Sequence, residues 1–173
     1  MLKQGYVQVY TGNGKGKTTA MLGLALRAVG AGLKVYIGQF VKDEGSSESK
    51  AIREYLPNVR IEQYGPYGLI EPDDMEDAIR VTLLGLEKAI QTISSGMYDI
   101  VMLDEINMAV YMGVLKVEHV LELIRNKPHN VELVLTGRYA AEEVIAAADL
   151  VSEICEVKHY YAAGVGSRIG IEE

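Results

Sequence analysis

The 173-residue sequence has few of the residues that mark secreted, zinc-binding or membrane-spanning proteins. Its one cysteine, Cys155, cannot form an internal disulfide, so a reducing cytoplasmic location and a small core residue are expected. No two histidine or cysteine residues have the spacing of zinc ligands, which argues against a structural zinc site. No run approaches the roughly twenty apolar residues of a membrane span, and no apolar secretory segment precedes the first predicted strand.

Positive charge is also scarce. The chain has 17 lysine and arginine residues against 24 aspartate and glutamate residues, a formal net charge of -7. A general nucleic-acid-binding protein depends on clustered basic residues, so no nucleic-acid partner is expected. A small basic pocket on an acidic surface would suit a phosphate-bearing small ligand better. The length is that of one domain, residues 1–173, and the apolar content of 49% is ordinary for a globular protein.

The most informative segment is a glycine-rich loop between an apolar run and a helical pattern. The run Tyr6–Tyr10 is followed by Gly12, Asn13, Gly14, Lys15, Gly16, Lys17, Thr18 and Thr19, and then by apolar residues at helical spacing. Glycines let backbone N–H groups converge on phosphate oxygens, and a helix N-terminus points its positive end at the same anion. Lys17 can place its ammonium on the phosphates, and the Thr18 hydroxyl can hold Mg²⁺. The segment predicts binding of a nucleoside triphosphate.

This loop departs from the usual phosphate-loop pattern at one position. Thr11 stands where the first glycine belongs, although Gly12 and Gly14 can supply the missing flexibility. A dinucleotide-binding GxGxxG fingerprint is excluded, because its third glycine would fall on Lys17.

Strand and helix patterns alternate along the chain, which predicts an α/β fold of the P-loop NTPase-like (RecA-like) class, with a mostly parallel sheet and helices on both faces. The predicted strands are Tyr6–Tyr10, Lys34–Phe40, Val59–Tyr64, Ile100–Leu103, Val131–Thr136 and Ile154–Val157. The predicted helices are Thr18–Val29, Ser47–Tyr55, Asp73–Ser94, Lys116–Arg125 and Ala140–Ala148.

Polar residues follow three of these strands, at the sheet edge where parallel sheets bind ligands. Asp104 and Glu105 end one strand, and they should have different roles because adjacent side chains on an extended chain point opposite ways. An acidic residue there can reach Mg²⁺ directly or through water. Arg138 ends another strand and can pair with phosphate or with Glu105, or be merely structural. Lys42 and Glu48 lie in a loop that either folds over the nucleotide or is simply solvated.

The chain resembles the ATP:corrinoid adenosyltransferases of the phosphate-loop type. The motifs that carry this resemblance are dispersed from the first strand to the C-terminus: Thr11–Ala20, Arg27–Gly30, Gly38–Lys42, Leu103–Glu105, Leu135–Arg138, Ala148–Glu153, Val157–His159 and Ala163–Val165. Thr11 in place of the first glycine is the family's own variant.

The resemblance implies that a reduced Co(I) corrinoid attacks the 5′ carbon of ATP and inorganic triphosphate leaves, in adenosylcobalamin synthesis or salvage. It assigns Gly14–Thr19 to the phosphate cradle, and Asn13 and Glu48 to positions near the sugar; Gly12 and Arg138 are also expected to bind the nucleotide. It assigns Thr18 and Glu105 to Mg²⁺, so that Lys17, Thr18 and Glu105 are the expected catalytic residues. It also implies a homodimer and a separate flavin-type reductase that supplies the reduced cobalt.

The corrinoid half of the family pattern is altered here. Where the family has Phe and Trp beside the corrinoid, this chain has Gly65–Leu69, in which Tyr67 is the candidate replacement, and it has no tryptophan. Ala162, Gly166 and Arg168 replace the usual Asp, Lys and Gln. Family members commonly carry an extra N-terminal segment, whereas here Lys3 lies almost at the first predicted strand. Two alternatives therefore stay open: another P-loop ATPase or kinase, and a nucleotide-dependent binding protein without corrinoid chemistry.

Overall fold

The computed structural model describes residues 2–41, 45–65 and 74–172. A six-stranded parallel sheet in the order β3-β2-β4-β5-β1-β6 forms its centre. The strands are β1 (Val7–Thr11), β2 (Val35–Phe40), β3 (Val59–Tyr64), β4 (Ile100–Asp104), β5 (Glu132–Thr136) and β6 (Leu150–Glu153). The helices are α1 (Lys17–Gly30), α2 (Ser47–Tyr55), α3 (Met75–Ser94), α4 (Ile106–Tyr111), α5 (Val117–Asn126) and α6 (Glu142–Ala147), and a 3₁₀ turn, η2, spans Tyr160–Ala163.

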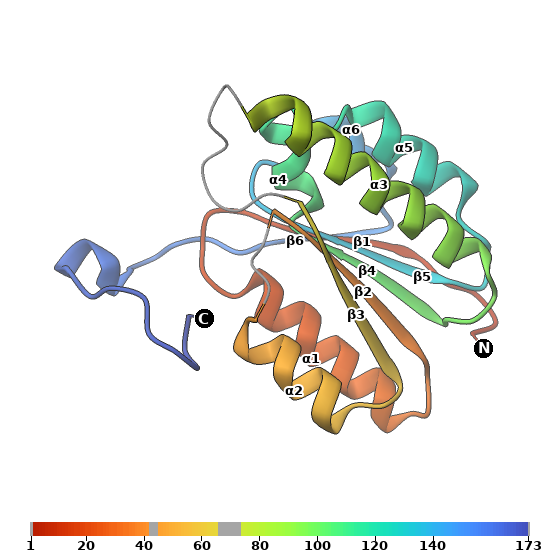
Figure 1. Ribbon diagram of the computed structural model, residues 1–173, viewed down its shortest axis with the longest axis horizontal. Helices are drawn as coiled ribbons and strands as arrows, with labels where there is room; N and C mark the ends of the chain where they lie inside the picture. The colour runs from red at the N-terminus through yellow and green to blue at the C-terminus, as the bar shows by residue number, and fades with distance from the viewer. Residues whose placement is uncertain (1, 42–44, 66–73, 173) are drawn as a thin grey trace.

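Helices cover both faces of this sheet. Figure 1 shows α1 and α2 on one face and α3, α4, α5 and α6 on the other. Each face has its own apolar core, one built around Met21, Ile37 and Met102 and the other around Phe40 and Leu103. Every residue of β2, β4 and β5 is buried, as expected for central strands covered on both sides. The predicted α/β class and parallel sheet are confirmed.

The last predicted strand was placed too late in the sequence. The observed strand β6 is Leu150–Glu153, which pairs with β1, whereas residues 154–157 leave the sheet. The Ile154 N–H still donates to the Thr11 carbonyl of β1 at 2.9 Å, but its carbonyl accepts from the Gly14 N–H of the phosphate loop at 2.7 Å, and residues 155–157 are exposed. Cys155 is exposed, so the prediction of a core cysteine was wrong for the same reason.

Two other differences concern the helices. The six-residue helix α4 was not predicted, because it is short and begins directly after the acidic strand end. Helix α3 begins at Met75, and the predicted start at Asp73 lies outside the described residues. In the described part of the chain, no helix combines the length and apolar character needed to cross a bilayer.

The close contact of α3 with β3 gives a stability prediction. A Cβ added at Gly85 would lie 2.5 Å from Cβ and Cγ of Tyr64, so Gly85→Ala forces the helix and the strand apart. Gly23 lies in α1 with open space around its Cβ position and serves as the matched control. In urea unfolding, Gly85→Ala should lower the free energy of unfolding by about 1–3 kcal/mol. Gly23→Ala should raise it by about 0.5–1 kcal/mol, through helix propensity. Equal effects of the two variants would contradict the packing argument.

Candidate functional site

A pocket of about 460 Å³ lies at the carboxyl end of the sheet, beside the loop that joins β1 to α1. The residues expected from the sequence that line it are Gly14, Lys15, Gly16, Lys17, Thr18, Thr19, Glu48, Glu105 and Arg138. Asn13 is exposed, and Gly12 lies at the base of the same loop. Lys42 and Tyr67 lie outside the described residues. The tertiary structure thus brings four of the expected parts of the sequence to one pocket.

The unusual glycine positions of the loop have a packing cause. Gly12 has a φ of 95°, and a Cβ there would lie 2.5 Å from the Ile154 carbonyl oxygen. A Cβ on Gly14 would lie 2.8 Å from the Cys155 carbonyl. Thr11 instead belongs to β1, and its hydroxyl accepts from the Ala140 N–H at 3.3 Å. The chain that follows β6 therefore requires glycine at 12 and 14, whereas position 11 can carry a side chain.

Lys17 is buried inside the loop. Its ammonium donates to the carbonyls of Gly12 and Gly14 at 2.7 and 2.8 Å. Burial lowers the pKa of this ammonium, nearby Glu105 opposes that shift, and Arg138 reinforces it. A group that is desolvated and close to both a carboxylate and a guanidinium is typical of a site that binds a charged ligand.

Asp104 is the carboxylate of the site with the most hydrogen bonds, although no sequence signal favours it over Glu105. It is fully buried. The Thr136 hydroxyl donates to Oδ1 at 2.6 Å, the Thr18 hydroxyl donates to Oδ1 at 3.0 Å, and the Gln39 amide donates to Oδ2 at 3.1 Å. These contacts join the ends of β2, β4 and β5 to the first turn of α1. The sequence carries no local signal for these contacts, because Thr136 and Gln39 are far from Asp104 along the chain.

Glu105 has a different environment from Asp104, but not for the expected reason, because Glu105 lies beyond the end of the extended strand β4. It precedes α4 in a left-handed conformation with a φ of 58°, and its backbone N–H donates to the Thr136 hydroxyl at 3.0 Å. Its side chain is half-buried and lines the same pocket as Arg138. Gly137 permits this approach, since a Cβ there would lie 2.9 Å from the Met108 nitrogen. The turn after β5 is thereby held against α4, which places Arg138 at the pocket.

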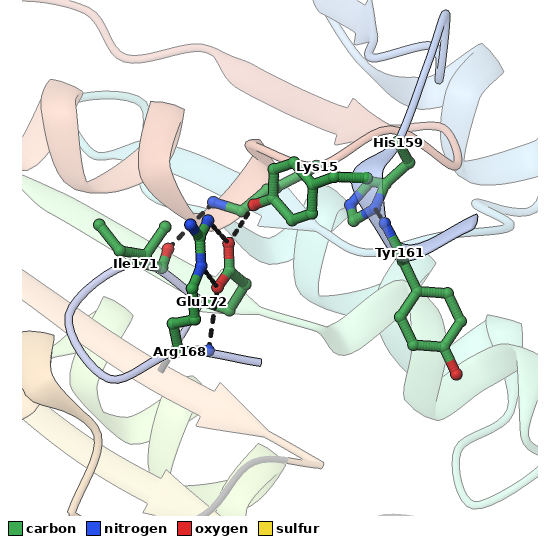
Figure 2. Close-up of polar contacts among 7 residues, drawn as sticks. Lys15, His159, Tyr161, Arg168, Ile171 and Glu172 are labelled. Atoms are coloured by element: carbon green, nitrogen blue, oxygen red, sulfur yellow. Dashed lines mark hydrogen bonds and ion pairs between the residues drawn. The ribbon is translucent and has the colours of Figure 1, made fainter. Parts of the chain in front are cut away.

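The C-terminal segment also reaches the pocket, which the sequence did not predict (Figures 1 and 2). The Lys15 ammonium donates to the Ile171 carbonyl at 3.0 Å. Glu172 accepts from the backbone and guanidinium of Arg168 at 3.0 and 3.1 Å and from the Tyr160 hydroxyl. Arg168 is the main cause of the lowered pKa of Glu172, about 2, and Tyr160 adds to it. The tail is therefore folded back so that its last residues border the loop.

The oxygen-rich donor set suits Mg²⁺. Thr18 and Glu105 line the pocket, and the buried Asp104 carboxylate accepts from the Thr18 hydroxyl behind them. Within the described ranges, no group of three or more His, Cys, Asp or Glu residues could hold a metal by itself. Mg²⁺ commonly takes only one or two protein ligands, together with water and substrate phosphates. These residues therefore fit Mg²⁺ bound with a nucleotide.

Comparison with known proteins agrees with this geometry. The model of the family described as ATP:corrinoid adenosyltransferase BtuR/CobO/CobP matches residues 3–172. The chain is 34% identical over 171 residues to a corrinoid adenosyltransferase of Pseudomonas aeruginosa, covering 98% of this chain and 84% of that protein. It is 33% identical over 170 residues to a corrinoid adenosyltransferase of Escherichia coli, covering 98% and 86%.

These similarities extend over nearly the whole chain, including the altered C-terminal third as well as the phosphate loop. The pocket supplies the cationic and hydroxyl groups that a triphosphate requires. The chain therefore belongs to the ATP:corrinoid adenosyltransferase family and is an enzyme that adenosylates corrinoids with ATP.

Proposed function

We propose that this enzyme uses its phosphate-loop pocket to bind the triphosphate of ATP as the leaving group of an alkyl transfer. The electron pair of a Co(I) corrinoid attacks the 5′ carbon and forms the cobalt–carbon bond, while the bond from C5′ to the triphosphate oxygen breaks. Cobalt is formally oxidised to Co(III), and both electrons of the broken bond leave with inorganic triphosphate. No protein side chain acts as the nucleophile.

One observation carries this proposal: Lys17, Thr18, Glu105 and Arg138 converge on a single pocket. Negative charge develops on the leaving triphosphate in the transition state. Groups that stabilise this charge more strongly in the transition state than in bound ATP lower the barrier. A phosphate loop is suited to that task, because its N–H groups and ammonium are in place before the reaction. The same loop can therefore serve alkyl transfer without any group that activates water.

The positions of the individual residues support the following proposed roles. Lys17 and the loop N–H groups hold the phosphates, and Arg138 is close enough to add a second positive charge. Thr18 and Glu105 are the proposed Mg²⁺ positions, and Asp104 orients the Thr18 hydroxyl. Bound Mg²⁺ would supply additional positive charge to the triphosphate oxygens. Glu48, half-buried at the rim, is the proposed contact near the sugar.

Other features of the proposal come from the length and composition of the chain and from the family resemblance. Residues 1–173 would act as one nucleotide-binding domain in the cytoplasm, and two copies would form a homodimer. A flavin-type reductase would supply Co(I), which fits a reducing compartment. Tyr67 remains the proposed aromatic neighbour of the corrinoid.

The test is an anaerobic assay with ATP, Mg²⁺ and chemically reduced cobalamin, in which the corrinoid spectrum and the released phosphates are followed together. We expect adenosylcobalamin and inorganic triphosphate in equal amounts. Release of orthophosphate without adenosylcobalamin would indicate an ATPase and contradict the proposal. ATP binding without any product would instead indicate a nucleotide-dependent binding protein.

A further inference from the structure

A second groove, with a volume of about 850 Å³, runs along the edge of the sheet formed by β3. It is lined by Val59–Tyr64, by Arg53 and Leu56 from the side of α2, and by Met97 and Tyr98 on the other side. It shares no lining residue with the phosphate-loop pocket. Within the described part of the chain, β3 pairs only with β2 (Figure 1). The groove therefore follows a strand edge that faces away from the sheet.

Two hydrogen bonds determine which backbone groups of β3 face outward. The Val35 N–H donates to the Asn58 carbonyl at 3.0 Å, and the Val41 N–H donates to the Tyr64 carbonyl at 3.2 Å. Even-numbered residues of β3 therefore direct their backbone groups toward β2. Because this direction alternates along a strand, Ile61 directs its N–H and C=O outward, into the groove.

The side chains of β3 are complementary to a second copy of the same strand. Arg60 and Glu62 lie on one face and form an ion pair at 3.0 Å. Antiparallel pairing about a two-fold axis at Ile61 places Arg60 opposite Glu62 of the partner subunit. The same axis places Glu62 opposite Arg60 of the partner subunit. These would be non-hydrogen-bonded pairs, in which cross-strand side chains are closest. The two copies of Ile61 would then exchange two backbone hydrogen bonds.

The charge pattern on this edge favours pairing. Natural sheet edges are commonly protected by charges that repel an incoming strand. On β3 the exposed arginine and the more buried glutamate, with exposed side-chain fractions of 64% and 22%, have opposite signs and are two residues apart. This arrangement is attractive to an antiparallel copy in the register centred on Ile61, because both opposed pairs then have opposite charges. Met97, which lines the groove, is 60% exposed, and a partner could cover its apolar surface.

We propose that β3 is the interface of a homodimer, in which two copies pair antiparallel about Ile61 and join their sheets into one. This inference deepens the homodimer proposed above by naming the surface that forms it. In an isologous interface each contact between different residues occurs twice, so the dimer would contain two Arg60–Glu62 pairs between subunits.

The experiment measures the mass of the protein in solution by analytical ultracentrifugation over a range of concentrations. The native protein should have twice the 19.0 kDa mass of the chain. Arg60→Glu places like charges opposite each other twice, so the dimer dissociation constant should rise about tenfold or more. Arg125→Glu, the same charge change on exposed α5, is the matched control and should leave the constant unchanged. Melting curves verify that both variants fold.

Amide hydrogen exchange of the native protein gives an independent readout that needs no variant. The Ile61 N–H should be protected at concentrations that favour the dimer and should exchange faster on dilution. An unchanged dissociation constant in Arg60→Glu, or an Ile61 amide that exchanges equally fast in the dimer and the monomer, would overturn the β3 interface. A native protein that is monomeric at all concentrations would overturn the homodimer as well. The adenosyl-transfer assay would still decide the enzymatic proposal separately.

Discussion

Replacing Lys17 with alanine is expected to abolish detectable ATP binding. The Lys17 ammonium is buried within the loop, where it donates to two carbonyls and lies close to Glu105 and Arg138. A hydrogen bond from a charged donor contributes about 1.5–3 kcal/mol, and the phosphates would lose a buried charge as well as a donor. ATP affinity should therefore fall by roughly a hundredfold or more, as measured by isothermal titration calorimetry.

The control for this variant is Lys50→Ala, which removes an exposed lysine from α2. It should bind ATP as the native protein does. A saturating amount of ATP should raise the melting temperature of the native protein and of Lys50→Ala, because a ligand stabilises the state to which it binds. The same amount of ATP should leave the melting temperature of Lys17→Ala unchanged. Affinity of Lys17→Ala within about threefold of the native value would show that the nucleotide is bound elsewhere.

The second large effect is expected from Glu105. Glu105→Gln keeps the size of the side chain but removes the charge that we assign to Mg²⁺. A metal ion that stabilises charge in a transition state is worth several kcal/mol, so turnover at fixed Mg²⁺ should fall by about a hundredfold or more. Steady-state rates over a series of Mg²⁺ concentrations measure this effect. ATP affinity without Mg²⁺ should change much less, since Lys17 and the loop N–H groups remain.

Asp104→Asn separates the two neighbouring carboxylates. An asparagine can still accept the Thr136 hydroxyl, but it weakens the hold on Thr18, so the loss should be smaller, about ten- to a hundredfold. Glu118→Gln, an exposed change on α5, is the control and should have no effect. A larger loss in Asp104→Asn than in Glu105→Gln would move the main Mg²⁺ role to Asp104.

The sequence predicted the sheet well where its local signals are strong. The continuous apolar runs at β2, β4 and β5 indicated strands covered on both faces, and all three are buried throughout. The signal was weakest at β6, an exposed edge strand whose pattern continues into a segment that leaves the sheet. Nothing in the periodicity distinguishes pairing with β1 from packing over the phosphate loop.

The sequence by itself determined the class of the protein. Glycines, lysine and threonine at fixed spacing between a strand and a helix act through local backbone geometry, so they can be recognised without knowing the rest of the fold. The acidic end of β4 and the basic end of β5 could be expected near that loop, because parallel strands present their carboxyl ends at one edge.

Only the tertiary structure decided how these groups are held. It selected Asp104 as the partner of Thr18, explained glycine at 12 and 14 by the close approach of Ile154 and Cys155, and brought the C-terminal residues to Lys15. It also determined which side of β3 faces outward. These contacts join residues that are far apart in the sequence, and they depend on strand order and packing distance. Local composition specifies neither the strand order nor the packing distances, because both depend on how the whole chain buries its two apolar cores.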